Sequence, residues 1–283
     1  MSLRLLFTMK ASVIINTYNR PLYLSRVIRG YLSQSVPPHE IIIADDGSTV
    51  ETAALVNYFQ EKAPVRIMHV WHEDKGFRLA KIRNRAIAAA TGDYIIISDD
   101  DTIPSPYMVQ DHEAHAEQGC FIQGHRVLLK EEVSKDFTFE RIVFSNLLKL
   151  AVTGKIGNFK NALRPPFPVI VKSRKRSGIR GCNMSFFRKD LLAVNGFNED
   201  FEGWGSEDFE LVERLYKYGL FQKNLQFRAV CFHLYHPEYS RDNRQKNIEL
   251  FKETIAANGF YLKNGLDKYI EENRAGQKGL TLV

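Results

Sequence analysis

The first hundred residues alternate between short apolar runs rich in β-branched side chains and stretches with helical spacing. The apolar runs are ASVIINT (11–17), EIIIADDGS (40–48), VRIMHVW (65–71) and DYIIISDD (93–100). The helical stretches between them cover 21–34, 52–62 and 79–90. Continuous apolar strands separated by helices predict a parallel sheet that helices cover on both faces. The expected fold class is therefore α/β, with a Rossmann-like, mostly parallel sheet flanked by helices.

Three of these predicted strands become polar only at their carboxyl ends, at Asn16–Arg20, Asp45–Ser48 and Asp99–Asp101. Ligands of such sheets bind beyond the carboxyl ends of the strands, so we expect these groups along one edge. In extended chain the side chains of Asp99 and Asp101 point to the same side, where their charges repel unless a cation lies between them. Mg²⁺ or Mn²⁺ with substrate phosphate oxygens fits this arrangement, and an acidic turn after a strand is the alternative.

Two further groups could serve a nucleotide. The carboxylates of Asp45 and Asp46 can accept hydrogen bonds from ribose hydroxyls or a base edge, or they can simply form a turn. Lys75, Arg78 and Arg83 supply cations ahead of and within a predicted helix, where a diphosphate could be held. An ordinary basic helix face is the other reading of these three residues.

The second half of the chain is patterned less regularly, without a linker or an internal repeat, which favours a single domain. We expect a helix near 104–117, a strand near 120–129, a weakly patterned region over 131–180, a strand at 226–234 and a helix near 242–257. The polar tail from Glu271 should be frayed.

The stretch FEGWGSEDFEL (201–211) precedes and enters a helix expected over Glu207–Tyr218. Ser206 could cap this helix, and the acids at 207 and 208 would complement its positive end. A capped surface helix does not explain why Trp204 stands between two glycines.

Composition limits the partners and the compartment. The formal charge of +6 and the sequence pI near 9.1 favour a polyanionic partner such as a phosphorylated small molecule or an acidic membrane surface. The segment KSRKRSGIR (172–180) holds five basic residues and no acid, and it is either a solvated loop or a lid that meets phosphates. We expect no nucleic-acid binding, because the basic residues lack interleaved aromatic residues.

The three cysteines, Cys120, Cys182 and Cys231, have neither zinc-site spacing nor the density of a disulfide scaffold. No apolar run approaches the roughly 20 residues that cross a bilayer, and the opening MSLRLLFTMK is short for a signal peptide. These features predict a cytoplasmic protein, with peripheral membrane contact through 172–180 as an additional reading.

Taken together, the motifs resemble a known family. The series NTYNR, IIIADDGS, KGxxxAxxRN (75–84) and IIISDDD resembles the nucleotide-sugar half of family 2 glycosyltransferases, which have the GT-A fold. The stretch 180–211 resembles the acceptor half of β-1,4-galactosyl- and N-acetylgalactosaminyltransferases and of bacterial chondroitin-type polymerases. The resemblance covers roughly 11–240 and implies one GT-A domain over 9–270. Its nucleotide-sugar half would be 10–103 and its acceptor half 104–270, with 271–283 as a flexible tail.

This resemblance implies roles for individual residues. Asp99 and Asp101 become the DxD motif that holds a divalent metal on a UDP-sugar diphosphate, and Asp100 is its middle position. A histidine of CFHLYHPEYS would complete the metal site, either His233, which we prefer, or His236. The implied donor nucleotide-binding residues are Thr17, Tyr18, Asn19, Arg20, Asp45, Asp46, Lys75, Arg78, Arg83, Asp99 and Asp100.

The resemblance also answers the question that Trp204 raises. In an inverting transfer Asp208 would accept the proton of the acceptor hydroxyl, Glu207 would bind acceptor hydroxyls and Trp204 would face a sugar ring. The implied function is metal-dependent transfer of a hexose or N-acetylhexosamine from a UDP-sugar to a glycan or lipid-linked glycan during polysaccharide biosynthesis. The alternatives are a catalytically silent glycan-binding module and a sugar-1-phosphate nucleotidyltransferase, although NTYNRP lacks the glycine-rich phosphate loop of the latter.

Overall fold

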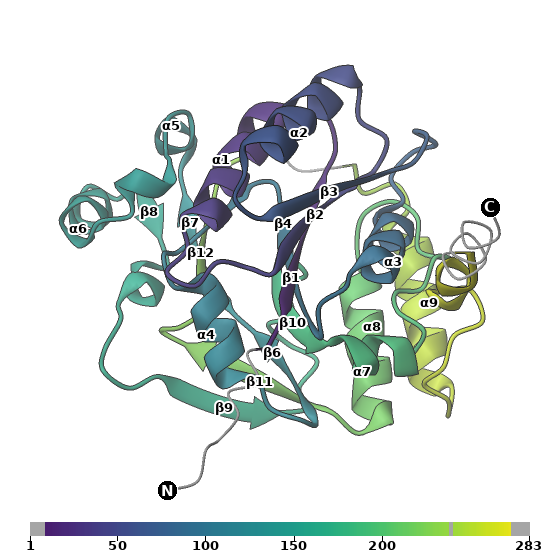
Figure 1. Cartoon of the computed structure of the whole chain (residues 1–283). Coiled ribbons are helices and arrows are strands. Elements are labelled where there is room, and N and C mark those ends of the chain that lie inside the picture. The colour runs from purple at the N-terminus through teal and green to yellow at the C-terminus, as the bar shows by residue number, and fades with distance from the viewer. Residues whose placement is uncertain (1–8, 238–239, 273–283) are drawn as a thin grey trace, which may run out of the picture.

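The computed structural model describes residues 9–237 and 240–272, and an eight-stranded sheet runs through their centre (Figure 1). The strand order is β3-β2-β1-β4-β10-β6-β11-β9. The strands are β1 (Ala11–Thr17), β2 (Glu40–Asp45), β3 (Arg66–Trp71), β4 (Tyr94–Asp99), β6 (Cys120–Gln123), β9 (Val169–Ser173), β10 (Asn183–Phe187) and β11 (Phe221–Gln226).

The first four strands confirm the predicted βα series. They are parallel neighbours, and their register pairs Asn16 with Asp99 and Thr17 with Asp45, so their carboxyl ends share one edge. Helices α1 (Pro21–Leu32), α2 (Val50–Lys62) and α3 (Leu79–Ala89) connect them. Alternate strand residues enter two cores, because side chains on neighbouring positions of a strand point to opposite faces. One core packs against α1 and α2, and the other packs against α3.

The strand expected over 120–129 is wrong as a single element. It breaks at Gly124 into β6 and β7 (His125–Leu129), which belong to different sheets. A side chain at 124 would collide with the carbonyl oxygen of Ala229 and with Asn183, so the chain changes sheet at a residue without a Cβ. The second sheet has the order β5-β12-β7-β8 and contains β5 (Thr102–Pro104), β12 (Val230–His233) and β8 (Ile156–Gly157).

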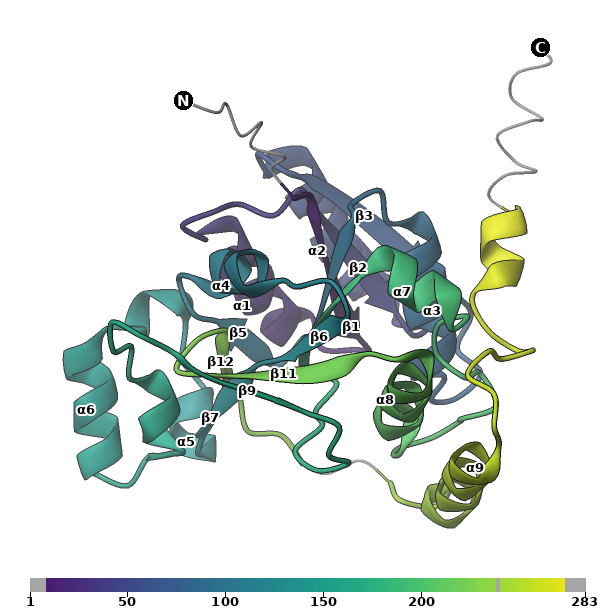
Figure 2. The same ribbon diagram turned by 90° about the horizontal axis from the view of Figure 1, so that it is seen from below.

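The strand expected over 226–234 is also divided. Its first residue ends β11, which the sequence did not reveal, and β12 begins only at Val230 after a turn in which Phe227 and Ala229 have positive φ. Strand β10 runs antiparallel to both β4 and β6, so the sheet is mixed in its second half. Figure 2 shows β6, β11 and β9 of this half from below.

The remaining helices fill the second half. The weakly patterned region 131–180 contains α5, α6 and short 3-10 helices η1 and η2, and α4 starts after the short strand β5. The bounds are α4 (Met108–His115), α5 (Glu131–Ser134), η1 (Phe139–Arg141), α6 (Phe144–Val152), η2 (Phe159–Ala162), α7 (Arg188–Ala193), α8 (Glu207–Tyr218) and α9 (Arg244–Ala256). Within the described residues, no helix has the length and apolar character to cross a bilayer. Most of the tail expected from Glu271, residues 273–283, lies outside the described residues.

Candidate functional site

The polar ends of β1 and β4 hold each other in place. Asn16 donates its side-chain amide to the Asp99 carboxylate at 2.8 Å, and the Thr17 hydroxyl donates to Asp100 at 2.8 Å. Arg20, at the start of α1, contacts Asp100 at 3.8 Å and Asp101 at 3.2 Å. The sheet edge therefore gathers the acidic triplet among hydrogen-bond donors, as the sequence predicts.

The triplet is not extended as expected. Residues 100 and 101 form a turn, so Asp99 faces Asn16 and Arg83 whereas Asp101 faces the end of β12. The carboxylate of Asp101 lies 3.0 Å from Nε2 of His236 and 3.7 Å from Nε2 of His233. Asp101 and both histidines offer ligand atoms that all lie within 4.8 Å of one another. Both histidines that the sequence left open thus belong to one group, and the carboxylate of Asp99 lies outside it.

Two members of this group, His233 and Asp101, are in protonation states that suit a metal ion. Burial lowers the pKa of His233 to about 4, which keeps the imidazole neutral near pH 7. The hydrogen bond with Asp101 raises the pKa of His236, so this imidazole would have to release a proton when a metal binds. Burial alone would raise the pKa of Asp101, but the bond from His236 and the charges of both histidines hold it below its ordinary value. Oδ1 of Asp101 is buried and finds no hydrogen-bond partner among the described residues, which leaves an oxygen free to bind a cation.

Arg83 joins the acidic triplet to the start of α8. This buried guanidinium lies 3.7 Å from Asp99, 2.8 Å from Asp208 and 3.6 Å from Glu207. The Cζ atom of Arg83 also lies 5.0 Å from the centre of the Phe197 ring. The charge of Arg83 therefore compensates three carboxylates, and it brings residues 99 and 208 to the same guanidinium.

Asp208 is oriented through both carboxylate oxygens. Oδ1 binds Arg83, and Oδ2 accepts the backbone N–H of Gly181 at 2.9 Å. A Cβ at 181 would overlap this carboxylate, so the close approach requires glycine. Asp208 is partly exposed and sits in the first turn of α8.

The predicted cap of α8 is wrong in its mechanism. Ser206 occupies the cap position, but its φ of 73° is left-handed and its hydroxyl makes no cap hydrogen bond to any described residue. Gly203 and Gly205 also have positive φ, so the chain turns sharply before the helix. That turn places Glu207 in a buried position, where burial and the nearby charge of Asp208 raise its pKa to about 7.

Asp99 shows the same physical effect. Burial among protein atoms raises its pKa to about 6 although 31% of its side chain still meets solvent, while the nearby Arg83 opposes the rise. Burial also raises the pKa of Asp100 well above its ordinary value. Perturbed carboxylates concentrated in one place are typical of a functional site.

Trp204 lines a groove of about 340 Å³ beside this site. Trp204 is 40% exposed, and Cζ of Arg241 lies 5.3 Å from the centre of its ring. Lys75 and Arg78, which we expected near a diphosphate, line the same groove. Lys75 pairs with Glu73, and the guanidinium of Arg78 donates to the carbonyl of that residue. The structure therefore places these two cations with Trp204.

The second acidic strand end is engaged internally. Asp45 is fully buried and accepts bonds from the Ser48 N–H and His69, and Asp46 accepts bonds from His72 and the Arg78 N–H. These bonds shape the loop after β2. Tyr18 is exposed and donates to Asp74, and Asn19 has a left-handed φ of 52° and binds Ser48 and Thr49.

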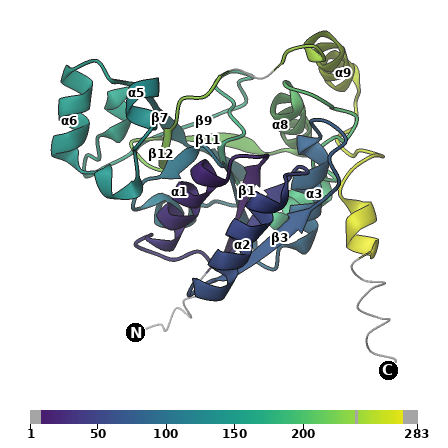
Figure 3. The ribbon, with the colours of Figure 1, turned by 90° about the horizontal axis from the view of Figure 1, so that it is seen from above.

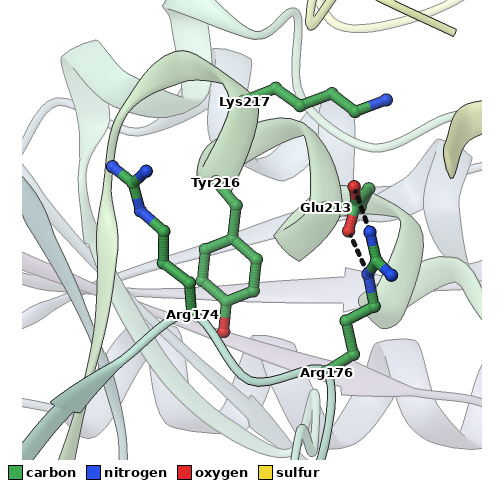
Figure 4. A pocket seen from close by; sticks show the side chains of 5 residues that line it. All are labelled: Arg174, Arg176, Glu213, Tyr216 and Lys217. Atoms are coloured by element: carbon green, nitrogen blue, oxygen red, sulfur yellow. Dashed lines mark hydrogen bonds and ion pairs between the residues drawn. The ribbon is translucent and has the colours of Figure 1, made fainter.

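The basic segment 172–180 is tied down in a different place. Its first two residues belong to β9, and Arg174 donates to the carbonyls of Gly219 and Leu220 at the end of α8. Arg176 forms two bonds with Glu213, and Figure 4 shows both arginines with Lys217 around a pocket of about 510 Å³. These cations contact the carboxyl-terminal half of α8, whereas Asp208 lies in its first turn.

Three residues to which the sequence analysis gave no individual role support the site. Asn16 binds Asp99, Gly181 binds Asp208, and Asn84 ties α3 to residues 197 and 199. Asn16 is already predicted at the polar end of its strand, and the structure adds its bond to Asp99. The other two roles depend on contacts between distant segments.

Comparison with known proteins places this geometry in a family. The model of glycosyl transferase family 2 matches residues 12–192, and the model described as the N-terminal domain of galactosyltransferase matches 170–237. A validoxylamine A glucosyltransferase of Streptomyces hygroscopicus subsp. limoneus is 30% identical over 231 residues, which are 74% of this chain and 48% of that protein. A chondroitin synthase of Escherichia coli is 25% identical over 78% of this chain and 34% of its own length. The chain thus spans half or less of these relatives.

Solved structures share the fold at low identity. TarS 1-349 of S. aureus has a TM-score of 0.62 at 17% identity and covers 93% of this chain and 69% of its own. The mannosyltransferase PcManGT of Pyrobaculum calidifontis, solved with GDP-Man and Mn²⁺, has a TM-score of 0.58 at 19% identity. The match covers 88% of this chain and 65% of the mannosyltransferase chain. Since the family 2 model matches well over half of the residues and these neighbours have the same architecture, the chain belongs to glycosyl transferase family 2 and has the GT-A fold.

Proposed function

We propose that this protein is a metal-dependent, inverting glycosyltransferase that moves a hexose or N-acetylhexosamine from a UDP-sugar to a hydroxyl of a glycan. The observation that carries this proposal is the contact of Arg83 with both Asp99 and Asp208. It brings the acidic triplet at the end of β4 and a carboxylate at the start of α8 to one place. An inverting transfer needs a base on one side of the reacting sugar carbon and a group that holds the departing diphosphate on the other side. The carboxylate of α8 and the acidic triplet after β4 would supply these two parts.

Asp101, in the turn after β4, and the two histidines at and after the end of β12 fit a divalent metal. Asp101, His233 and His236 would hold it, and the buried, unpartnered oxygen of Asp101 supports this assignment. A metal bound there would neutralise negative charge on the leaving diphosphate. Asp99 faces Arg83 and Asn16, so we assign it to the donor side of the site and not to the first set of metal ligands.

Asp208 is our candidate base. Its carboxylate would take the proton of the acceptor hydroxyl as the oxygen of that hydroxyl bonds to the anomeric carbon and the bond to the diphosphate breaks. Arg83 and the Gly181 N–H orient the carboxylate, and each of its oxygens keeps a lone pair for the incoming proton. Glu207 adjoins it and can bind acceptor hydroxyls, while Trp204 offers a ring face in the neighbouring groove.

The donor and the glycan class rest on similarity. TarS has been solved with UDP-GlcNAc, and relatives named hyaluronan synthase and chondroitin synthase make polysaccharides by name. A UDP-sugar and a role in polysaccharide biosynthesis are therefore our choice. We also infer a cytoplasmic location, since all three cysteines are buried free thiols.

The test is a panel of UDP-sugars with Mn²⁺, scored by release of UDP, together with calorimetric titration of UDP in the presence and absence of Mn²⁺. We expect one or two donors to react. Asp101→Asn should abolish the Mn²⁺-dependent part of UDP binding, because it removes the charge at the centre of the ligand group. Asp208→Asn should leave UDP binding intact and lower turnover by about 10² to 10⁴.

Opposite results would exclude the proposal in separable ways. UDP binding without turnover for any donor would favour a silent glycan-binding module. Equal loss of UDP binding in both variants would contradict the division of labour between Asp101 and Asp208. Tyr58→Phe, a change on the exposed face of α2, serves as the matched control and should alter neither quantity.

A further inference from the structure

Helix α6 carries a wide apolar arc, and the core covers only one part of it. Its inner side packs Leu147, Leu150 and Ala151 against the core. Its outer side exposes Phe144, Leu148 and Val152, which are spaced four residues apart and therefore form one stripe; Val152 is 80% exposed. Ser145, Asn146 and Lys149 occupy the remaining, polar part of the helix circumference. The outer stripe of α6 is thus an apolar surface that the described fold does not bury.

A second exposed apolar group lies along β9, the outer strand of the central sheet. Phe167, just before the strand, is 83% exposed, and Val169, Ile170 and Val171 are all exposed as well. Large exposed apolar patches of soluble proteins mark sites of protein or membrane interaction. We call residues 141–180 the α6-β9 face; they contain α6, β9, the segment between them and the basic residues that follow β9.

The α6-β9 face is strongly cationic. Residues 141–180 contain ten lysines and arginines and no acid, whereas the whole chain has a net charge of +6, so the remainder is net negative. Five of the ten pair with acids outside the segment. The other five make no ion pair within the described residues and are Lys149, Lys160, Arg174, Lys175 and Arg180. In Figure 4, Arg174 and Arg176 border the same open pocket.

Helix α6 lies on the same side of the molecule as the chain that follows β12 (Figures 2 and 3). Figures 2 and 3 both show α6 and α9 at the two ends of one side, with the chain after β12 between them. Helices α1 and α2 lie toward the opposite side in Figure 3. His236, a member of the candidate metal group, belongs to the chain after β12.

We propose that the α6-β9 face docks the protein on an anionic lipid surface. Aliphatic and phenyl side chains would enter the headgroup and acyl boundary, while the lysines and arginines would meet lipid phosphates. An anionic glycan would match the charge but would leave Phe144, Val152 and Phe167 without an apolar partner. A second copy of the chain would bring two acid-free, cationic segments together, which like-charge repulsion opposes.

This docking does not depend on the proposed function, because it concerns a surface that contains none of the candidate catalytic residues. If both proposals hold, the site would face an acceptor that is itself carried by a lipid. The chemical class of acceptor would then be a glycan linked to an amphiphile, presented at the membrane surface.

The test is sedimentation of the full chain with vesicles of phosphatidylcholine containing phosphatidylglycerol and with vesicles of phosphatidylcholine alone. We expect binding to the anionic vesicles and little to the neutral ones. Phe144→Ser/Val152→Ser/Phe167→Ser should weaken binding by roughly tenfold or more, and so should Lys149→Glu/Lys175→Glu. All these side chains are exposed, so UDP binding with Mn²⁺ should remain at its wild-type level and report an intact fold.

Matched controls come from the opposite side. Leu22→Ser/Val50→Ser removes two equally exposed apolar side chains from α1 and α2. Lys10→Glu/Lys62→Glu makes the same charge change at two exposed lysines, one just before β1 and one at the end of α2. Both should retain vesicle binding. No binding to anionic vesicles, or equal loss in these controls, would overturn the proposal. A serine variant that kept vesicle binding but lost self-association would instead indicate docking of a second copy of the chain. Binding of dextran sulfate to wild type and serine variant alike, with no binding of either to vesicles, would indicate an anionic glycan. Either result would overturn the proposal.

Discussion

The two halves of the candidate site are built in different ways. In the donor half, Asn16 and Asp99 stand at the ends of parallel strands whose register alone brings them side by side. In the acceptor half, Asp208 is positioned by Arg83, 125 residues earlier, and by Gly181, 27 residues earlier. The first half therefore depends on regular backbone geometry, and the second depends on individual long-range contacts.

This difference indicates which substitutions should disturb the site most. Changing one side chain at a strand end leaves the parallel ladder and its register in place. Changing one contact of the acceptor half removes the restraint on a functional carboxylate. We therefore expect substitutions at Arg83 and Gly181 to have effects out of proportion to their size.

The largest effect should follow Arg83→Gln. The change leaves Asp99, Glu207 and Asp208 without the guanidinium that compensates their charge, and a broken buried ion pair costs about 3–5 kcal/mol. We expect the free energy of unfolding in urea to fall by about that amount. Turnover should fall by about 10², because Asp208 loses its orientation.

Arg85→Gln is the matched control, since Arg85 lies on the same helix and is only partly buried. It should change the unfolding free energy by less than about 1 kcal/mol. If the Arg83 variant were as stable as this control, the three carboxylates would not depend on the shared guanidinium, and the contrast between the halves would be lost.

The next effect concerns Gly181→Ala. The added methyl group overlaps the Asp208 carboxylate, so that side chain must leave its bond to the 181 N–H. We expect turnover to fall about tenfold or more while UDP binding with Mn²⁺ stays near the wild-type value. Calorimetry and UDP-release assays on the same preparation measure both quantities.

Gly259→Ala is the control, because a Cβ at that exposed position meets none of the described atoms within 4 Å. Equal turnover in the two variants would mean that Asp208 tolerates displacement. Weaker UDP binding in the Gly181 variant would instead mean that the two halves are not separable at this position.

A smaller, pH-dependent effect should locate acid sensitivity in the acceptor half. His112 on α4 bonds to Ser185 at 2.7 Å and to Asn183 at 3.0 Å, and burial lowers its pKa to about 4. The unfolded chain binds this proton near pH 6.5, so stability is present above that pH and is lost as pH falls from about 6.5 toward 4. We expect wild type to lose about 2 kcal/mol through this group between pH 7.5 and pH 5.

Urea unfolding at both pH values measures this loss. His112→Gln removes the titration and should flatten the pH dependence, although the variant will be less stable at pH 7.5. His39→Gln, at an exposed position after α1, should keep the wild-type slope. An unchanged slope in the His112 variant would assign the acid sensitivity to other groups.

The same contrast explains how much the sequence could predict. Continuous apolar runs located β1 to β4, period-3.6 patterns located α1 to α3, and the polar strand ends located the acidic triplet, because these features depend on neighbours in the chain. The division of 120–129 at Gly124 depends on the carbonyl of Ala229, more than a hundred residues away. The roles of Gly181 and Arg83 depend on contacts of the same kind.

The stretch 201–211 could be predicted only in part. The residues 201–211 were identified as a functional stretch because the tryptophan between two glycines is hard to explain as surface helix. The sequence could not show that Lys75 and Arg78 line the groove of Trp204, since that depends on how two loops meet. A backbone bond from the Gly203 N–H to the Phe77 carbonyl, at 2.9 Å, joins those loops.

The smallest effect tests how the chain enters α8. If Ser206 were a hydrogen-bonding cap, Ser206→Ala would cost about 1 kcal/mol and Ser206→Gly only a few tenths. Its left-handed φ of 73° gives the opposite expectation for glycine, because a residue with a Cβ pays about 1–2 kcal/mol in that conformation.

We therefore expect Ser206→Gly to raise the free energy of unfolding in urea by about 0.5 kcal/mol, after the greater freedom of glycine in the unfolded chain is offset. Ser206→Ala should be close to wild type, since it keeps the strain and loses no cap. A stabilised glycine variant with lower turnover would be the most informative result. It would mean that the strained turn holds Asp208 in place, so that the acceptor half gives up stability for the position of one carboxylate. A glycine variant less stable than wild type would restore the capping interpretation and remove strain from the account of this half.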